Sequence, residues 1–159
     1  MARTFTTASE FDCSADTLFD LFADGAFQEA RAVALGATQA RCVVESKTDD
    51  EVVVRVEATR ASYGGRGEER SVMRMWLDRR TRGSRWTQTV IGYEDRASVE
   101  GTSDVEEVDG ARARLVVKGT IAIRIPVIGR VIESKIVGAI DRLAAKEAEF
   151  IRGRLRGEC

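Results

Sequence analysis

Residues 126–155 read PVIGRVIESKIVGAIDRLAAKEAEFIRGRL, a stretch in which apolar residues recur every three or four positions. This spacing puts Ile128, Ile132, Ile136 and Ile140 on one face of a helix, and the same stripe continues to the end of the stretch. Pro126 suits the first helical turn, where its missing N–H costs no hydrogen bond. A helix of this length would span roughly 45 Å. The stretch therefore predicts one long amphipathic helix, against which the preceding residues must pack.

The bulk composition fits one domain over residues 1–159. The chain is 43% hydrophobic, enough for one sizeable core in a protein of 159 residues. Its 25 basic and 26 acidic residues nearly cancel, which disfavours a nucleic-acid partner. No apolar run is long enough for a membrane span, and the first residues lack the apolar core of a signal peptide. We therefore expect a cytoplasmic protein that is a monomer or a homodimer.

The sequence contains no histidine, and its three cysteines, Cys13, Cys42 and Cys159, are widely spaced. This pattern disfavours a disulfide framework and a zinc site and suits a reducing compartment. The missing histidine also removes the commonest general base and the Ser–His and Cys–His nucleophile pairs. We expect no metal and no cofactor. An enzyme is less expected than a binding protein, although carboxylates, lysine and tyrosine remain available for catalysis.

The residues before the long helix alternate in polarity, as half-buried strands do. Ser14 is a candidate N-cap after the first strand, Asp24-Gly25 divides two short helices, and Gly36 ends the second. Asp109-Gly110 lies between alternating segments and is a strong hairpin signal. Because no helix separates the later strands, a doubly wound parallel sheet is excluded and an α+β domain is predicted. The expected strands cover residues 5–13, 38–47, 52–58, 72–79, 86–91, 97–108 and 112–125.

Three local features have two interpretations each. The stretch from Ser62 to Glu69 holds three glycines and is either a plain connection or a mobile lid. Arginines cluster around Gly83, where a solvated hairpin tip is favoured over a phosphate site. Gly101 and Gly119 lie inside predicted strands, where glycine marks a bend or a close backbone approach. A sheet bent at these glycines can curl around a helix. The clustered arginines are Arg79, Arg80, Arg82 and Arg85.

This order of elements resembles the helix-grip fold of the START-like, SRPBCC superfamily, which includes polyketide cyclases, lipid-transfer START domains and relatives of plant pollen allergens. Residues 119–133, GTIAIRIPVIGRVIE, are similar to the strand-to-helix junction of a bacterial family in it, domain of unknown function 2505. That junction has an apolar strand, Pro, two residues, Gly, three residues and Glu. The resemblance implies a seven-stranded curved antiparallel sheet around the long C-terminal helix, two short helices after the first strand, and a hydrophobic cavity between sheet and helix.

The candidate cavity residues come from the aromatic side chains, the last strand and the helix stripe, although core filling explains each of them too. Glu133 is a possible polar anchor for a ligand, but a structural salt bridge near the helix start is favoured. Gly129 and Gly138 within the helix indicate close packing or room for a ligand. The predicted lining is Phe27, Trp76, Trp86, Tyr93, Leu115, Val117, Ile121, Ile128, Ile132, Ile136 and Ile140.

Three functions remain open at this point. The first is carriage or sensing of a hydrophobic small molecule, such as a lipid, fatty acid, isoprenoid or polyketide, because such pockets are mostly apolar with few polar anchors. The second is a cyclase or aromatase that uses the cavity as a mould, which would need a buried carboxyl with a perturbed pKa. The third is a co-chaperone-like interaction module, which would expose a large apolar patch over a closed interior.

Overall fold

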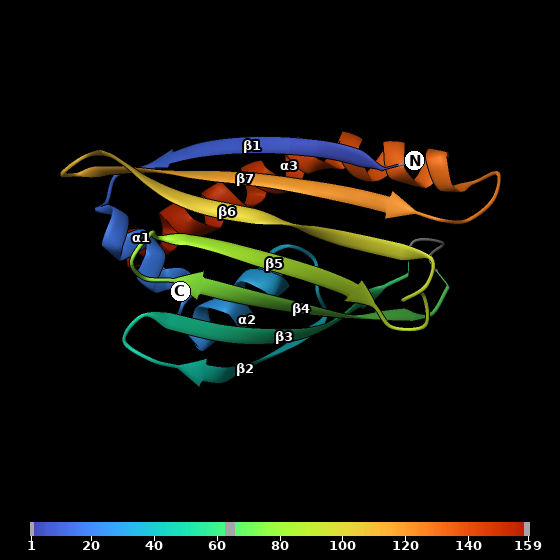
Figure 1. Ribbon diagram of the computed structural model, residues 1–159, viewed down its shortest axis with the longest axis horizontal. Coiled ribbons are helices and arrows are strands. Elements are labelled where there is room, and N and C mark those ends of the chain that lie inside the picture. Colours follow the sequence, from blue (N-terminus) through green and yellow to red (C-terminus); the bar gives the residue numbers. More distant parts are fainter. Residues whose placement is uncertain (1, 63–65, 158–159) are drawn as a thin grey trace.

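The computed structural model describes residues 2–62 and 66–157. One strand and two short helices come first, then six strands, and last the long helix (Figure 1). The elements are β1 (Arg3–Phe11), α1 (Ala15–Phe22), α2 (Gly25–Ala34), β2 (Gln39–Lys47), β3 (Glu51–Ala61), β4 (Glu68–Asp78), β5 (Gly83–Val90), β6 (Ala97–Asp109), β7 (Arg112–Ile123) and α3 (Gly129–Leu155). Of the described helices, none is long and apolar enough to cross a membrane. The predicted lid between Ser62 and Glu69 includes residues 63–65, which lie outside the described residues.

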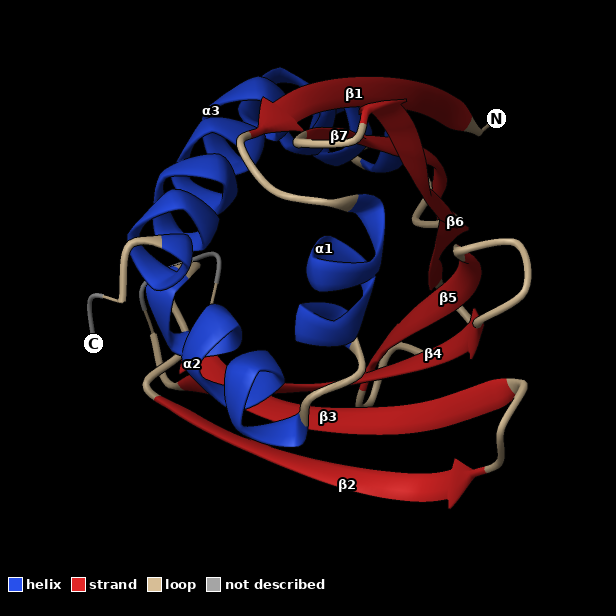
Figure 2. Ribbon diagram, turned by 90° about the vertical axis from the view of Figure 1, so that its left-hand side faces the viewer, coloured by secondary structure: helices blue, strands red, loops and turns tan. Residues whose placement is uncertain are grey.

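The seven strands form one antiparallel sheet in the order β1-β7-β6-β5-β4-β3-β2. Strands β2 to β7 follow one another as hairpins, and β1 joins the sheet beside β7. Figure 2 shows the sheet curving from β1 round to β2, with α3 and α2 along its open side and α1 inside the curve. The predicted α+β helix-grip architecture, with two short helices after the first strand, is confirmed.

A pair of facing glycines allows close packing on the inner face of the sheet. Gly101 of β6 is the register partner of Gly119 of β7, and both lie on the inner face. A Cβ on Gly101 would overlap the carbonyl oxygen of Lys118, and a Cβ on Gly119 would overlap the ring of Phe5. The close approach predicted from these two glycines is therefore confirmed. Any larger residue at either position would push the strands or the covering ring apart.

The ends of the sheet differ, and we name them by what they carry. The α1 end has α1 and the β4–β5 turn, while the loop end has the β3–β4, β5–β6 and β7–α3 connections (Figure 1). Most of the large apolar residues pack into a continuous core beneath α1 and the C-terminal half of α3. Its buried members are Phe11, Ala15, Leu18, Phe19, Phe22, Phe27, Val52, Val54, Met75, Leu77, Trp86, Val105, Ala113, Leu115, Ala148 and Ile151.

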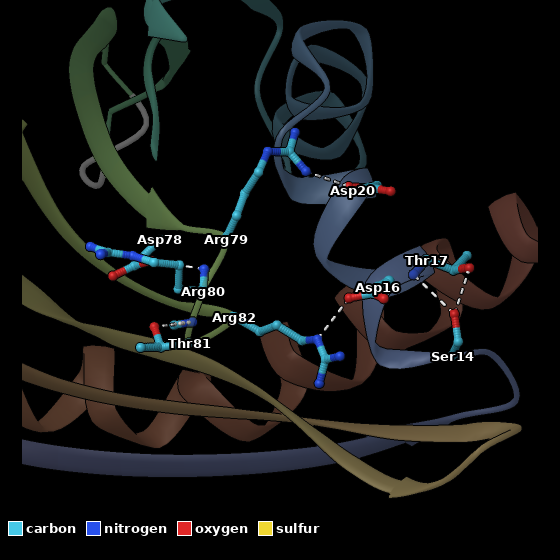
Figure 3. Close-up of polar contacts among 10 residues, drawn as sticks. Ser14, Asp16, Thr17, Asp20, Asp78, Arg79, Arg80, Thr81 and Arg82 are labelled. Carbon is cyan, nitrogen blue, oxygen red and sulfur yellow. Dashed lines mark hydrogen bonds and ion pairs between the residues drawn. The ribbon is translucent and has the colours of Figure 1, made fainter. Parts of the chain in front are cut away.

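The arginine-rich turn between β4 and β5 is solvent-exposed, and two of its arginines connect it to α1. Arg79 bonds to Asp20 at 2.9 Å and Arg82 to Asp16 at 2.7 Å, both carboxylates belonging to α1 (Figure 3). Ser14 caps this helix by accepting from the amide of Thr17. Both ion pairs are exposed, so each stabilises the fold by about 1 kcal/mol or less. The arginines thus have partners within the chain, which favours a structural role over phosphate binding.

Helix α3 begins at Gly129, three residues later than the sequence pattern predicts. Pro126 stands before the helix, and the amide of Ile128 donates to the carbonyl of Pro126 across a tight turn. At the centre of this turn Val127 has φ +71°, a left-handed conformation that is uncommon for a β-branched residue. The helix then runs for 27 residues. The predicted start at Pro126 is wrong because the chain must turn before it can enter the helix.

The C-terminal half of α3 is anchored to the rest of the core. Phe150 stacks on Phe27 of α2 with ring centroids 5.5 Å apart, and Ile151 is fully buried. Glu147 forms an ion pair with Arg31 of α2. These contacts join α2 to α3 along the side of the curved sheet that the strands leave uncovered (Figure 2).

Candidate ligand-binding site

The burial of side chains differs along the inner face of the sheet. Register pairs Val54 with Met75 and Met75 with Trp86, and all three are buried in the core. Met73 lies two positions closer to the loop end than Met75, on the same face. Met73 and its register partner Gln88 are only partly buried. The same holds for Val99 of β6. At this level of the sheet, Met73, Gln88 and Val99 are thus partly accessible, whereas Ile121 beside them and Ser71 nearer the loop end are buried.

Helix α3 leaves this part of the sheet without direct cover. Within the described ranges, its backbone comes close to β1, β7 and α2 and to no other element. Its stripe residues Ile132, Ile136 and Ile140 are half-buried, whereas Ala148 and Ile151 further along the helix are buried. Apolar side chains of α3 and of the inner sheet face thus remain partly accessible across the loop end. A hydrophobic molecule placed there would remove this apolar surface from water.

Several predicted lining residues do lie on the interior side of the sheet. Leu115, Val117 and Ile121 alternate with outward residues along β7, and Ile121 is completely buried. Trp86 lies on the inner face of β5 and packs against Gly101. Phe27 is also fully buried, but it packs between the rings of Phe22 and Phe150 in the core. Of these five predicted residues, Val117 is the one that remains half-buried.

Three other predicted lining residues lie outside the interior. Trp76 is on the opposite face of β4 from Met75, and the guanidinium of Arg85 stacks over its ring at 3.8 Å. Tyr93 is in the β5–β6 connection and is 47% exposed. Ile128 precedes the first residue of α3 and is 51% exposed. The prediction that these three residues line the cavity is therefore wrong. Strand register directs the side chain of Trp76 outward, and Tyr93 and Ile128 lie in connections.

Glu133 has a structural position rather than a place in the interior space. Its side chain is 1% exposed, and Oε2 accepts a hydrogen bond of 2.8 Å from the backbone amide of Ile123. Gly129, one turn earlier, packs so closely on β7 that a Cβ would lie 2.5 Å from the carbonyl oxygen of Ile123. Gly138 is exposed, and a Cβ there would have no neighbour within 4 Å. The favoured structural interpretation of Glu133 agrees with this geometry, although its partner is a backbone amide.

Polar groups within the fold were missed by the sequence analysis. Gln28 of α2 is fully buried, and its Nε2 donates to the carbonyl of Phe22 at 2.7 Å while Oε1 has no partner among the described residues. Arg60 follows Ala58 by two residues on β3, and its buried Nε has no partner there either. The signal for Arg60 was available, because the alternation of inward residues along β3 continues to position 60. For Gln28 we find no sequence signal.

Two depressions mark the molecular surface. One, of about 510 Å³, lies at the β7–α3 junction and is lined by residues that include Pro126, Gly129 and Glu133. The other, of about 560 Å³, lies over the outer face of β2 to β4, where Arg41 and Arg70 contribute to its lining. Neither lining includes Met73, Val99 or the stripe residues Ile132, Ile136 and Ile140.

Comparison with known proteins places the chain in a family and confirms its fold. The family described as Protein of unknown function (DUF2505) matches residues 6–155, as the sequence resemblance predicted. No curated protein matches the chain.

Solved structures with low sequence identity share the architecture. The Zhui aromatase/cyclase from Streptomyces sp. R1128 matches with a TM-score of 0.70 and 14% identity over 97% of this chain and 93% of that one. A START superfamily protein from Mycobacterium smegmatis has a TM-score of 0.65 and 14% identity over 97% of both chains. Norcoclaurine synthase from Thalictrum flavum, in complex with dopamine and hydroxybenzaldehyde, has a TM-score of 0.67 and 13% identity over 95% and 87%. At these identities the likeness shows the shared helix-grip fold.

Proposed function

Because this chain belongs to the family described as Protein of unknown function (DUF2505), its function has to be argued from its own interior, and we propose that it binds a hydrophobic small molecule there. The ligand is a lipid, fatty acid, isoprenoid or polyketide. It occupies the space between the N-terminal half of α3 and the inner sheet face at the loop end. The protein carries or senses this molecule and leaves it chemically unchanged.

The observation that supports binding is the partial exposure of interior-facing aliphatic side chains at the loop end. Met73 and Val99 of the sheet and Ile132, Ile136 and Ile140 of α3 are all half-buried. Each methylene that a ligand buries against such a surface contributes about 0.8 kcal/mol. A chain of a dozen methylenes has enough apolar surface to bind with useful affinity after the entropic cost of association.

Carriage is favoured over catalysis by the chemistry of the interior. The chain has no histidine. Ser71, Gln88 and Ser103 on the inner sheet face are neutral groups, and the buried carboxylate of Glu133 bonds to a backbone amide. The likeness to an aromatase/cyclase is one of fold at 14% identity, so it does not by itself favour a reaction.

Thermal unfolding with a ligand panel tests the proposal. A ligand at one hundred times its Kd adds about 2.7 kcal/mol to the free energy of unfolding. For a domain of this size, that stabilisation raises Tm by roughly 5–10 °C. We expect this shift with at least one long-chain acid, isoprenoid or polyketide, and mass spectrometry should recover the compound unaltered. A panel without any shift would overturn binding, and recovery of a converted compound would favour the cyclase alternative.

A matched pair of variants locates the binding site. Ile136→Ala removes a half-buried side chain from the stripe, whereas Val131→Ala removes an exposed one from the opposite face of the same helix. The first variant should weaken ligand binding several-fold, since it removes apolar contacts. The second should bind as the unmodified protein does. Equal affinity of both variants would place the ligand elsewhere.

A further inference from the structure

Arg60 is the charged residue that the fold places on the inner face of the sheet at the loop end of β3. The inward residues of this strand are Val52, Val54, Val56 and Ala58, all buried, and the period of two brings position 60 to the same face. Ala58 packs with Ala32 and Ala37 around α2. Arg60 therefore comes at the boundary between the apolar interior and the loop end.

The guanidinium of Arg60 lacks the partners that a partly buried arginine normally has. Its Nε is buried, and no hydrogen-bond acceptor reaches it from any residue that the structure describes. Arginine stays charged at all ordinary pH values, so this donor cannot be relieved by losing a proton. An unmet buried donor on a charged group is costly, and such groups are normally paired. Among the described residues, this donor is therefore left open for an acceptor.

The surroundings of Arg60 are polar on one side and apolar on the other. Its register partner on the neighbouring strand β4 is Glu69. Among the described residues, no ion pair of 4.0 Å or less joins Arg60 and Glu69. One step inward on the same face, Ala58 is opposite Ser71. Towards the interior follow the half-buried side chains of Met73 and Gln88. A molecule that reaches Arg60 from the interior would thus have its charged end at the loop end and its apolar part beneath α3.

We infer that Arg60 binds the head group of the ligand, and that the ligand is an amphiphile with a single anionic head, either a carboxylate or a phosphate. The planar guanidinium offers parallel N–H donors that match the two oxygens of such a group. The tail of the amphiphile takes the apolar space of the proposed function, on which this inference rests. Glu69 competes with the head group for Arg60, since its carboxylate is the nearest acidic group by register.

Four twelve-carbon probes that differ only in the head group test this inference: dodecanoate, dodecyl phosphate, dodecan-1-ol and dodecyltrimethylammonium. We expect the unmodified protein to bind one or both anions more tightly than the alcohol, and the cation most weakly. The comparison of dodecanoate with dodecyl phosphate distinguishes a fatty acid from a phosphorylated lipid. Binding is measured by displacement of a fluorescent hydrophobic dye, below the micelle concentration of each probe.

Three substitutions assign the effect to Arg60. Arg60→Gln should weaken binding of the anion roughly ten- to a hundredfold, the loss of one charge-assisted hydrogen bond, and leave the affinity for dodecan-1-ol unchanged. Unchanged alcohol binding also shows that the variant has kept its interior. Arg70→Gln is the control, because Arg70 is exposed on the opposite sheet face next to Thr59. Glu69→Gln removes the competing carboxylate and should tighten binding of the anion.

The outcomes separate this inference from the proposed function. If the alcohol and the anions bind equally well, or if Arg60→Gln and Arg70→Gln behave alike, the head-group role of Arg60 is overturned while hydrophobic binding stands. If none of the four probes binds, this inference is overturned, and the wider ligand panel decides whether the proposed function stands. A preference for the cation would reverse the assignment and point to Glu69 as the anchor.

Discussion

Two glycines of α3 give opposite predictions for the same substitution. Helix propensity alone favours Ala over Gly by about 1 kcal/mol at an interior helical position. Gly138 is exposed in the middle of α3, and a Cβ there would have no neighbour within 4 Å. Gly138→Ala should therefore stabilise the protein by about 0.5–1 kcal/mol. Gly129 is at the first position of the helix, where the gain from propensity is smaller.

At Gly129 the close contact with β7 outweighs propensity. An added Cβ would lie 2.5 Å from the carbonyl oxygen of Ile123, so the helix start would have to move several tenths of an ångström away from the strand. Overpacking of this kind costs about 1–3 kcal/mol. The movement would also lengthen the 2.8 Å bond from the amide of Ile123 to Glu133, and a hydrogen bond to a charged group is worth about 1.5–3 kcal/mol. Gly129→Ala should therefore destabilise the protein by about 2 kcal/mol.

Urea unfolding followed by circular dichroism measures both variants under one set of conditions. We expect the two free energies of unfolding to differ by about 2–3 kcal/mol, with Gly138→Ala above the unmodified protein and Gly129→Ala below it. The slope of the unfolding transition should stay the same, since neither change alters the surface that unfolding exposes. Stabilisation by Gly129→Ala would refute the argument, because it would mean that the junction is loose and that propensity alone decides.

Three further predictions concern pH, thiol reactivity and packing. Hydrogen bonds from Arg114 and Arg112 hold the pKa of the Glu10 carboxyl below its ordinary value of 4.5. The unfolded chain therefore binds this proton more readily, and the stability it confers is present above about pH 4.5 and lost as pH falls through the lower folded-state value; Glu10→Gln should flatten the dependence of Tm on pH in that acidic range, and an unchanged profile would contradict the assignment. Burial, with Glu29 and Asp24 nearby, raises the pKa of the Cys42 thiol to about 11, so at pH 8 it should carry on the order of a hundredfold less thiolate than an ordinary cysteine. Alkylation followed by peptide mass spectrometry should show slow labelling of Cys42 that accelerates as pH rises, and rapid labelling at pH 8 would count against this environment. Ile151→Ala should cost about 2–5 kcal/mol because the side chain is fully buried, whereas Ile136→Ala should cost clearly less; equal losses in urea unfolding would mean that the interior beneath Ile136 is packed solid.

The order of elements and the faces of most strands were predictable because both depend on local sequence. Alternation of polarity has a period of two in strands, and the stripe of α3 has the period of a helix. Turn residues such as Asp109-Gly110 marked the hairpins, and consecutive hairpins allow only antiparallel neighbours. Gly101 and Gly119 indicated close backbone contact, and in the structure they are register partners. The order of elements together with the junction motif from Gly119 to Glu133 indicated the family, which the match over residues 6–155 confirms.

The candidate site was predicted only in part. Whether a residue lines the interior space depends on which side chains face it from other elements of the fold. Met75 and Trp76 are both apolar neighbours on β4, so their sequence could not reveal which one enters the core. The pairing with β3 and β5 directs Met75 inward and leaves Trp76 under Arg85. The exposed Ile128 was assigned to the stripe because the tight turn around Val127 has no clear sequence signature.

Local sequence patterns were enough to predict the class of fold, the strand periodicity, the long helix and the absence of histidine chemistry. The folded chain was needed to show that Glu133 accepts a hydrogen bond from the amide of Ile123, and that the buried Nε of Arg60 lacks a partner among the described residues. This difference follows from the range of the interactions involved. Turns and periodic burial are encoded within a few neighbouring residues, whereas the partner of a buried polar group is supplied by chain segments that meet only when the sheet closes around α3.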